Sequence, residues 1–254
     1  MTCLIERSIV FLGALLCAAA FAARASADTI VVPIVAEMDD LEEFLDGAEV
    51  GMLDVGSSDL ELGTEGPPEP RQAVGLRFLD IGILPGSTIN SASVQFMVDE
   101  ADDEITNLRI FGELTPNSSP FTDTPFNISS RTRTSSSVVW SNIPVWTTEG
   151  DTGPDQRTPD LSPILTEIIG QAGWMSGNAL SLIILPEPFT DNTGERTAIS
   201  FNKSMGTPNF QPPILTVDFV PIPEPSSLAL ALLATLGMLI SIRCANQRRV
   251  RLRR

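Results

Sequence analysis

The stretch Ser91-Ala92-Ser93-Val94-Gln95-Phe96-Met97-Val98 places a small or apolar residue at every second position. Successive side chains of a β-strand point to opposite faces of a sheet, so the even-numbered residues would share one face and the odd-numbered residues the other. The even-numbered face is apolar throughout, whereas the odd-numbered face is mostly polar. The stretch therefore predicts a strand that covers a hydrophobic core with one face only.

Similar segments recur along the chain. Alternating or short apolar runs occur at 74–79, 179–185, 197–201 and 214–219. Turn-forming sequences rich in Gly, Pro, Asp and Asn occur at 84–87, 151–154 and 191–194. Many short strands joined by such turns are typical of a mainly β fold, and we expect an antiparallel, jelly-roll-like β-sandwich.

One short helix is predicted inside this β pattern. Apolar residues recur at helical spacing at Leu161, Ile164, Leu165, Ile168 and Ile169. Ser162 is expected to cap the helix, with Pro163 in the first helical position and Gly170 at the stop. We expect the helix to cover one end of the sandwich. By contrast, residues 115–127 and the Ser- and Thr-rich stretch 129–137 predict a long irregular loop.

Several segments together resemble one known family, the DNRLRE-type domain. The matching pieces are 57–63, 77–80, 84–89, 91–94, 160–161, 173–180, 195–201 and 212–217. The resemblance covers about residues 28–219 and implies a β-sandwich related to carbohydrate-binding modules of secreted bacterial proteins. The chain departs from the family because it has no tyrosine, a residue in which the family's strands are often rich.

The N-terminus has the features of a secretory signal peptide spanning residues 1–27. Arg7 lies in a short polar start, and an apolar segment runs from 9 to 23. Ala25-Ser26-Ala27 is an A-x-A cleavage sequence, which would leave Asp28 as the new N-terminus. We expect the segment to be helical and the chain to be exported across the inner membrane.

The C-terminal segment 220–254 consists of three parts. Pro223-Glu224-Pro225 comes first, an uncharged apolar run follows at 228–242, and the basic tail 243–254 contains six arginines. This order resembles the PEP-CTERM sorting signal of Gram-negative bacteria, in which an exosortase is thought to cut near the Pro-Glu-Pro motif. The apolar run is just long enough for a transmembrane helix, and the arginines would hold its end in the cytoplasm. An ordinary membrane anchor that is never cut is the alternative.

Composition excludes several classes of chemistry. The chain has no histidine, and its three cysteines, Cys3, Cys17 and Cys244, all lie in the end segments. Triads based on histidine, His-based metal sites and a disulfide framework therefore do not apply to residues 28–224. That portion has 31 acidic and 8 basic residues, a net charge of −23, which would repel nucleic acid.

Two sets of residues are candidates for ligand binding. The acidic cluster Asp99, Asp102, Asp103 and Glu104 lies between two predicted strands and offers oxygen ligands for calcium; a solvated loop is the alternative. Trp140 and Trp146 flank a short loop, and exposed indole rings there would stack on sugars. Packing in the core is the alternative for both rings.

These features favour an exported, non-enzymatic protein of the cell surface or extracellular matrix. We expect secretion machinery and an exosortase as partners, a membrane anchor before processing, and association with exopolysaccharide. A carbohydrate-binding module with a specific glycan ligand is the first alternative. A secreted hydrolase that uses paired carboxylates is the second, because acidic residues are plentiful.

Overall fold

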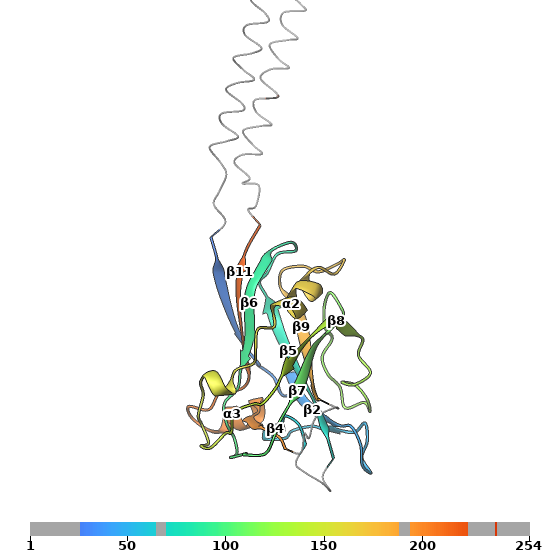
Figure 1. The fold of residues 1–254 in the computed structure, drawn as a ribbon. Coiled ribbons are helices and arrows are strands. Elements are labelled where there is room, and N and C mark those ends of the chain that lie inside the picture. The colour runs from blue at the N-terminus through green and yellow to red at the C-terminus, as the bar shows by residue number, and fades with distance from the viewer. Residues whose placement is uncertain (1–25, 65–69, 188–193, 223–236, 238–254) are drawn as a thin grey trace, which may run out of the picture. The chain divides into compact units, whose positions relative to one another are not determined.

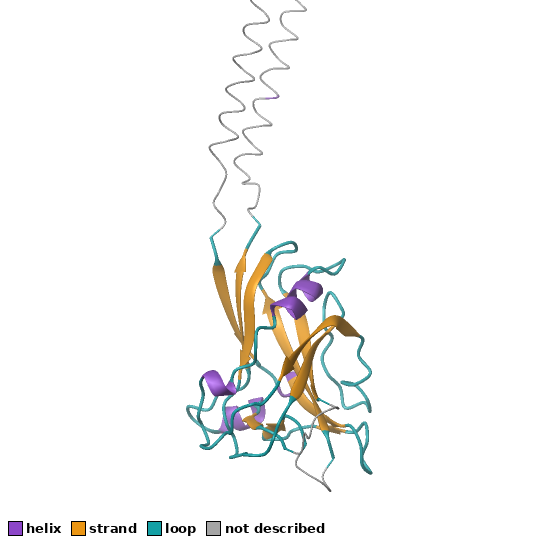
Figure 2. Cartoon of the chain, viewed as in Figure 1, coloured by secondary structure: helices purple, strands orange, loops and turns teal. Residues whose placement is uncertain are grey.

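The computed structural model describes residues 26–64, 70–187, 194–222 and 237 (Figures 1 and 2). The folded domain spans Ser26–Pro221. The predicted signal peptide up to residue 25, the sorting motif from Pro223 onward and the predicted membrane run, apart from Gly237, lie outside the described residues. None of the helices in the described residues combines the length and apolar character that crossing a bilayer requires.

One layer of the domain is a three-stranded antiparallel sheet. Its order is β1 (Asp28–Pro33), β11 (Ile214–Val220) and β6 (Thr88–Gln95). The predicted alternation holds along β6, where Ala92 and Val94 are buried in the core. It ends at Gln95, because the chain leaves the sheet there and Met97 is buried as well.

The second layer is a six-stranded antiparallel sheet. Its order is β3 (Leu53–Asp54), β2 (Asp40–Phe44), β5 (Gln72–Ile81), β9 (Asn178–Pro186), β7 (Leu108–Glu113) and β8 (Arg133–Trp140). Figure 1 shows the labelled strands of the two sheets as separate layers of the domain. The mainly β, antiparallel, sandwich-like fold predicted from the sequence is therefore confirmed.

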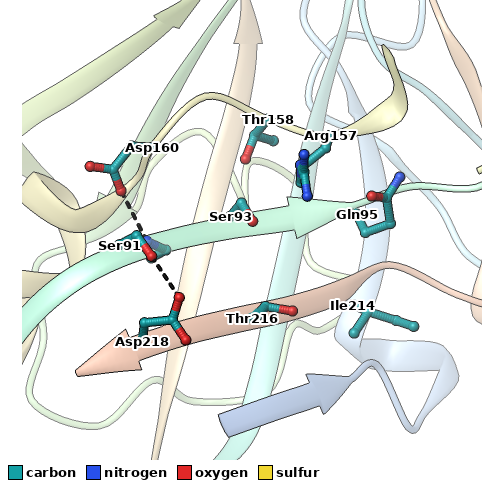
Figure 3. Close-up of a pocket in the computed structure, with 10 residues that line it drawn as sticks. Ser91, Ser93, Gln95, Arg157, Thr158, Asp160, Ile214, Thr216 and Asp218 are labelled. Carbon is teal, nitrogen blue, oxygen red and sulfur yellow. Dashed lines mark hydrogen bonds between the residues drawn. The ribbon is translucent and has the colours of Figure 1, made fainter. Parts of the chain in front are cut away.

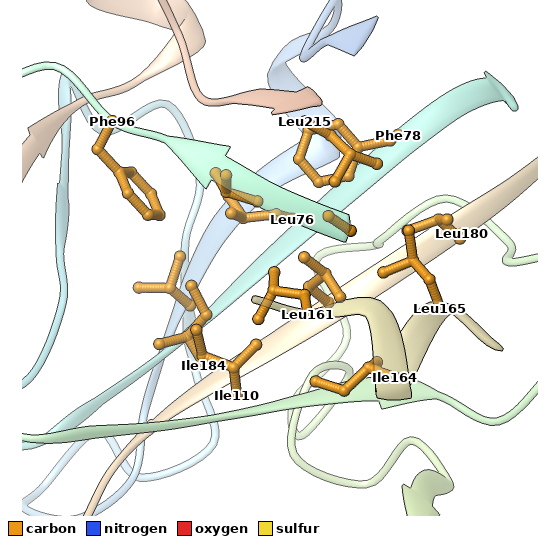
Figure 4. Packing of buried hydrophobic residues seen from close by; sticks show 14 of the residues in the cluster. Leu76, Phe78, Phe96, Ile110, Leu161, Ile164, Leu165, Leu180, Ile184 and Leu215 are labelled. Carbon is orange, nitrogen blue, oxygen red and sulfur yellow. The ribbon is translucent and has the colours of Figure 1, made fainter. Parts of the chain in front are cut away.

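The main hydrophobic core lies between the two sheets (Figure 4). Leu76 and Phe78 of β5 and Leu215 of β11 belong to this core cluster, and all three side chains are fully buried. Full burial of such a side chain contributes roughly 1.5–3 kcal/mol to folding. Because residues 28–224 contain no cysteine, this burial has to hold the domain together without disulfides.

The predicted helix is confirmed as α2 (Ser162–Ile169), which packs against the core. Gly112 on β7 makes this packing close, since a Cβ atom there would lie 2.6 Å from Cδ1 of Ile168 and 2.7 Å from Cγ2 of Ile164. The predicted cap was wrong: Ser162 is the first helical residue and Leu161 holds the N-cap position. Asp160 instead accepts a hydrogen bond of 3.0 Å from the Ser162 N–H.

A second, smaller hydrophobic cluster covers the other face of the six-stranded sheet. Phe121 and Ile128 are buried there against Leu41, Ala73 and Ile183. The segment 115–132 is therefore a packed cover rather than a free loop. The loop predicted at 129–137 was wrong from Arg133 onward, because these residues form β8 and pair with β7.

Short elements complete the domain at the end where α3 and β4 are labelled in Figure 1. β4 (Asp59–Glu61) pairs with β10 (Thr197–Ile199), and α3 (Phe201–Gly206) follows directly. Two single-turn 3-10 helices lie at Glu37–Asp39 and Pro154–Gln156.

Candidate ligand-binding groove

A groove of about 550 Å³ lies on the outer face of the three-stranded sheet (Figure 3). It exists because alternation on β6 and β11 turns apolar side chains into the core and polar ones outward. The residues that line it are Ser91, Ala92, Ser93, Gln95, Arg157, Thr158, Asp160, Ile214, Thr216 and Asp218. Hydroxyl, amide, carboxylate and guanidinium groups thus dominate the lining, and no aromatic ring contributes to it.

One wall of the groove is the segment 157–160, which runs beside the edge of β6. Thr158 N–H donates to the Val94 carbonyl at 3.0 Å, and in return Val94 N–H donates to Oγ1 of Thr158 at 3.0 Å. Ala92 N–H donates to Oδ1 of Asp160 at 2.9 Å. Side-chain oxygens here take the place of strand carbonyls, so the edge of β6 is satisfied without a fourth strand.

Asp218 connects the three strands of this sheet. Its Oδ1 accepts from Thr29 Oγ1 on β1 at 2.5 Å, and its Oδ2 accepts from Ser91 Oγ on β6 at 2.9 Å. The three residues lie opposite one another in the ladder. Hydrogen bonds from Thr29 and Ser91 lower the pKa of the Asp218 carboxyl, so it carries its charge at neutral pH.

Asp160 is the second carboxylate of the groove. Besides the Ala92 N–H, it accepts from the backbone N–H and the hydroxyl of Ser162, at 3.0 and 2.7 Å. Burial by itself would raise the pKa of Asp160, but these hydrogen bonds from Ser162 and Ala92 lower it. Asp160 is therefore a charged residue that positions the wall of the groove.

Arg157 stands at the other end of the groove, where it forms an isolated backbone bridge with Gln95. Its side chain is exposed. Among the basic residues that the structure describes, Arg157 alone has a side chain without an ion pair, a hydrogen bond or a ring contact. The sequence did not single out the groove residues, although the polar positions of the alternating strands contained the signal.

The two tryptophans proposed as a sugar platform lie in the core. Trp140 is 5% exposed and Trp146 is 1% exposed. Both rings pack on Phe96, with centroid separations of 6.0 and 6.5 Å, and Nε1 of Trp146 donates to the Asp155 carbonyl at 3.2 Å. Neither ring has a free face for a sugar, so the expectation of exposed indoles is corrected in favour of core packing.

The four carboxylates proposed for calcium are divided between different partners. Asp99 is buried and forms an ion pair with Lys203, while Oδ2 of Asp102 accepts from the Thr197 N–H at 2.8 Å. Burial raises the pKa of both carboxyls despite these bonds. Asp103 and Glu104 are exposed.

Within the described residues, no three or more acidic, His or Cys side chains form a group arranged to hold a metal ion. Calcium at this loop would have to compete with Lys203 for Asp99 and with a backbone N–H for Asp102. Calcium binding stays a prediction, and a comparison of melting temperatures in calcium and sodium at equal ionic strength tests it.

Comparison with known proteins does not assign a ligand to this groove. No protein-family model matches the chain, and no curated protein matches it either. The groove is therefore interpreted from its own geometry.

Proposed function

We propose that the protein is an exported, non-catalytic surface or matrix protein that holds exopolysaccharide in the groove of its three-stranded sheet. The export route is inferred from the two ends of the sequence, which resemble a signal peptide and a PEP-CTERM sorting signal. The observation that carries the binding proposal is the polar lining of the groove, which presents fixed acceptors and donors on a rigid sheet.

The hydrogen-bonded row formed by Thr29, Asp218 and Ser91 supports a ligand rich in hydroxyl groups. A carboxylate has about four lone-pair positions, and two of these on Asp218 are occupied by Thr29 and Ser91. The remaining positions are free to accept from sugar hydroxyls. Ser93 and Thr216 lie opposite each other along the same face and add hydroxyls of their own.

The electrostatics favour binding over hydrolysis. A glycosidase needs one carboxylic acid with a raised pKa beside a second, ionised carboxylate. Both carboxyls of the groove, Asp160 and Asp218, have lowered pKa values. The carboxyls whose pKa is raised lie outside the groove: Asp40, Glu42 and Asp99 are buried, and Asp102 is partly buried and accepts from the Thr197 N–H.

The arrangement of the strands is compatible with processing at both ends. β1 begins at Asp28, directly after the proposed cleavage sequence, and this residue pairs with Phe219 near the end of β11. Both proposed processing positions therefore flank neighbouring strands of one sheet.

Binding to isolated exopolysaccharide tests the proposal. We expect the full chain, purified in detergent, to bind the polysaccharide of its own envelope, and Thr216→Glu to abolish binding because the longer side chain occupies the groove and adds a third carboxylate beside Asp218 and Asp160. Ser135→Glu, at an exposed position on β8 of the other sheet, is the matched control and should bind as the parent does. Equal binding by the parent and Thr216→Glu would contradict the groove as the site.

A further inference from the structure

The groove has opposite charges at its two ends. Ser91 on β6 pairs with Asp218, and Asp160 lies beside the same row, whereas four residues further along β6 Gln95 pairs with Ile214 and neighbours Arg157. Figure 3 shows Asp160 and Asp218 at one end and Arg157 with Gln95 at the other. Four residues of strand span about 13 Å, so the two ends are separate binding positions.

Arg157 differs from the other basic residues that the structure describes, because its side chain has no ion pair, hydrogen bond or ring contact. The described domain is strongly acidic, and its other basic side chains are all engaged. Arg71, Arg77, Arg109, Arg131 and Lys203 have carboxylate partners, Arg133 lies over Phe111, and Arg196 is bonded to backbone carbonyls. An unpaired guanidinium inside a groove is poised for an anion, since it offers five N–H donors in a planar fork that matches a carboxylate.

We propose that the groove binds an acidic oligosaccharide, with the carboxylate of a uronic acid on Arg157 and the hydroxyls of a neighbouring sugar on Asp218 and Ser91. This inference rests on the proposed function and names the class of glycan. A neutral glycan offers the guanidinium hydroxyl acceptors, but it has neither the opposite charge nor the two-oxygen geometry of a carboxylate. A small inorganic anion would use Arg157 alone and leave the hydroxyl-binding end, about 13 Å away, unoccupied.

The charge of the domain limits the form of the ligand. A net charge of −23 over residues 28–224 repels long polyanions, and two carboxylates lie in the groove itself. The site therefore favours a glycan whose acidic sugars alternate with neutral ones over a polymer charged at every unit. Moderate salt screens the general repulsion beyond about 8–10 Å, while a direct contact at Arg157 is shorter than this length and keeps more of its attraction.

Calorimetric titration of the full chain in detergent tests the inference. The probes are aldotriouronic acid, which has one uronic acid and two neutral sugars, xylotriose as a neutral trisaccharide and sodium acetate as a lone carboxylate. We expect the acidic trisaccharide to bind at least about tenfold more tightly than either control, which corresponds to about 1.4 kcal/mol. Arg157→Gln should remove this preference and Arg157→Lys should restore part of it, because a lysine keeps the charge without the fork.

Arg71→Gln is the matched control, since Arg71 is also exposed but already paired with Asp46. Its titration should equal that of the parent, and melting temperatures verify that all variants are folded. Equal affinity for the acidic and neutral trisaccharides, or an acidic preference that survives Arg157→Gln, would overturn the acidic-ligand inference while leaving a glycan groove intact. Failure of every saccharide, including the native exopolysaccharide, would overturn the proposed function as well.

Discussion

The carboxylate of Asp40 accepts a hydrogen bond of 2.7 Å from the backbone N–H of Phe201, a residue 161 positions later in the chain. The bond joins the start of β2 to the first residue of α3. Asp40 is only 5% exposed, and burial, aided by the neighbouring Asp39, raises its pKa from 3.8 to about 8 even though the Phe201 bond lowers it. A proton at Asp40 is thus a structural component of the folded domain at neutral pH.

The first prediction concerns the pH dependence of stability. Between about pH 4 and pH 8 the folded chain retains a proton on Asp40 that the unfolded chain has lost. This stability is fully present below the unfolded pKa and is lost as pH rises through the folded one. The free energy of unfolding should fall by up to roughly 1.4 kcal/mol per pH unit in this window.

Asp40→Asn isolates this contribution, because asparagine keeps an acceptor oxygen for Phe201 but does not titrate. Urea denaturation of the parent and the variant at several pH values between 4 and 9 measures it. The difference between the two curves should change steadily with pH in favour of the variant. Parallel curves would show that Asp40 is ionised in the folded chain throughout.

The second prediction concerns Arg196, which is 1% exposed and holds several loops together. Its guanidinium donates to the carbonyls of Pro144 and Ile143 at 2.8 Å each and to Thr106 Oγ1 at 2.9 Å. Arg196→Met leaves these buried acceptors without their donor, so we expect a loss of more than about 3 kcal/mol of stability by urea denaturation.

The control for Arg196 is Arg71→Met, which breaks an ion pair with Asp46 at the surface and should cost at most about 1 kcal/mol. Similar losses for the two variants would refute the role of Arg196.

The third prediction concerns the contact between α2 and β7. Gly112→Ala should cost about 1–3 kcal/mol, because the new methyl group overlaps Ile168 and Ile164. Ile168→Val removes the nearer of the two atoms, Cδ1, and should cost about 0.5–1.5 kcal/mol by itself. The double variant should lose less stability than the sum of the single variants. Strict additivity would mean that the sheet and helix shift apart instead of clashing.

The fourth prediction concerns processing. If the sequence features at the two ends act as proposed, the protein isolated from its native envelope begins at Asp28 and ends near Glu224. Intact-mass measurement of this material gives both ends directly. A mature species that retains residues 228–254 would contradict sorting by an exosortase and favour an uncut anchor.

The strands and the helix that were recognisable from sequence are those with an apolar period. Alternation identified β6 and β11, and helical spacing identified α2. The strand β2 was not predicted, because three of the five residues in its sequence, Asp-Leu-Glu-Glu-Phe, are acidic and such a segment is usually solvated. It is a buried strand whose acidic side chains find backbone N–H partners elsewhere: Glu43 accepts from Ile128 at 2.7 Å and from Ser129 at 3.0 Å.

The candidate site was less accessible to sequence reasoning than the fold. The sequence predicted a sugar site at the tryptophans and a calcium site at an acidic run, because these residue types bind such ligands. In the structure, however, Trp146 is in the core and Asp99 is paired with Lys203. The groove consists of ordinary serines, threonines and aspartates. Such residues become notable only when the register of the strands brings them together.

By itself, the sequence determined which faces of the strands are apolar, where α2 forms and that residues 28–224 carry a strong negative charge. These properties depend on near neighbours in the chain and on composition. The tertiary structure alone decided that Ser91 meets Asp218, 127 residues away, and that Arg157 stays unpaired at the other end of the same groove. Such pairings depend on strand register and burial, which arise only when segments distant in the sequence pack against one core.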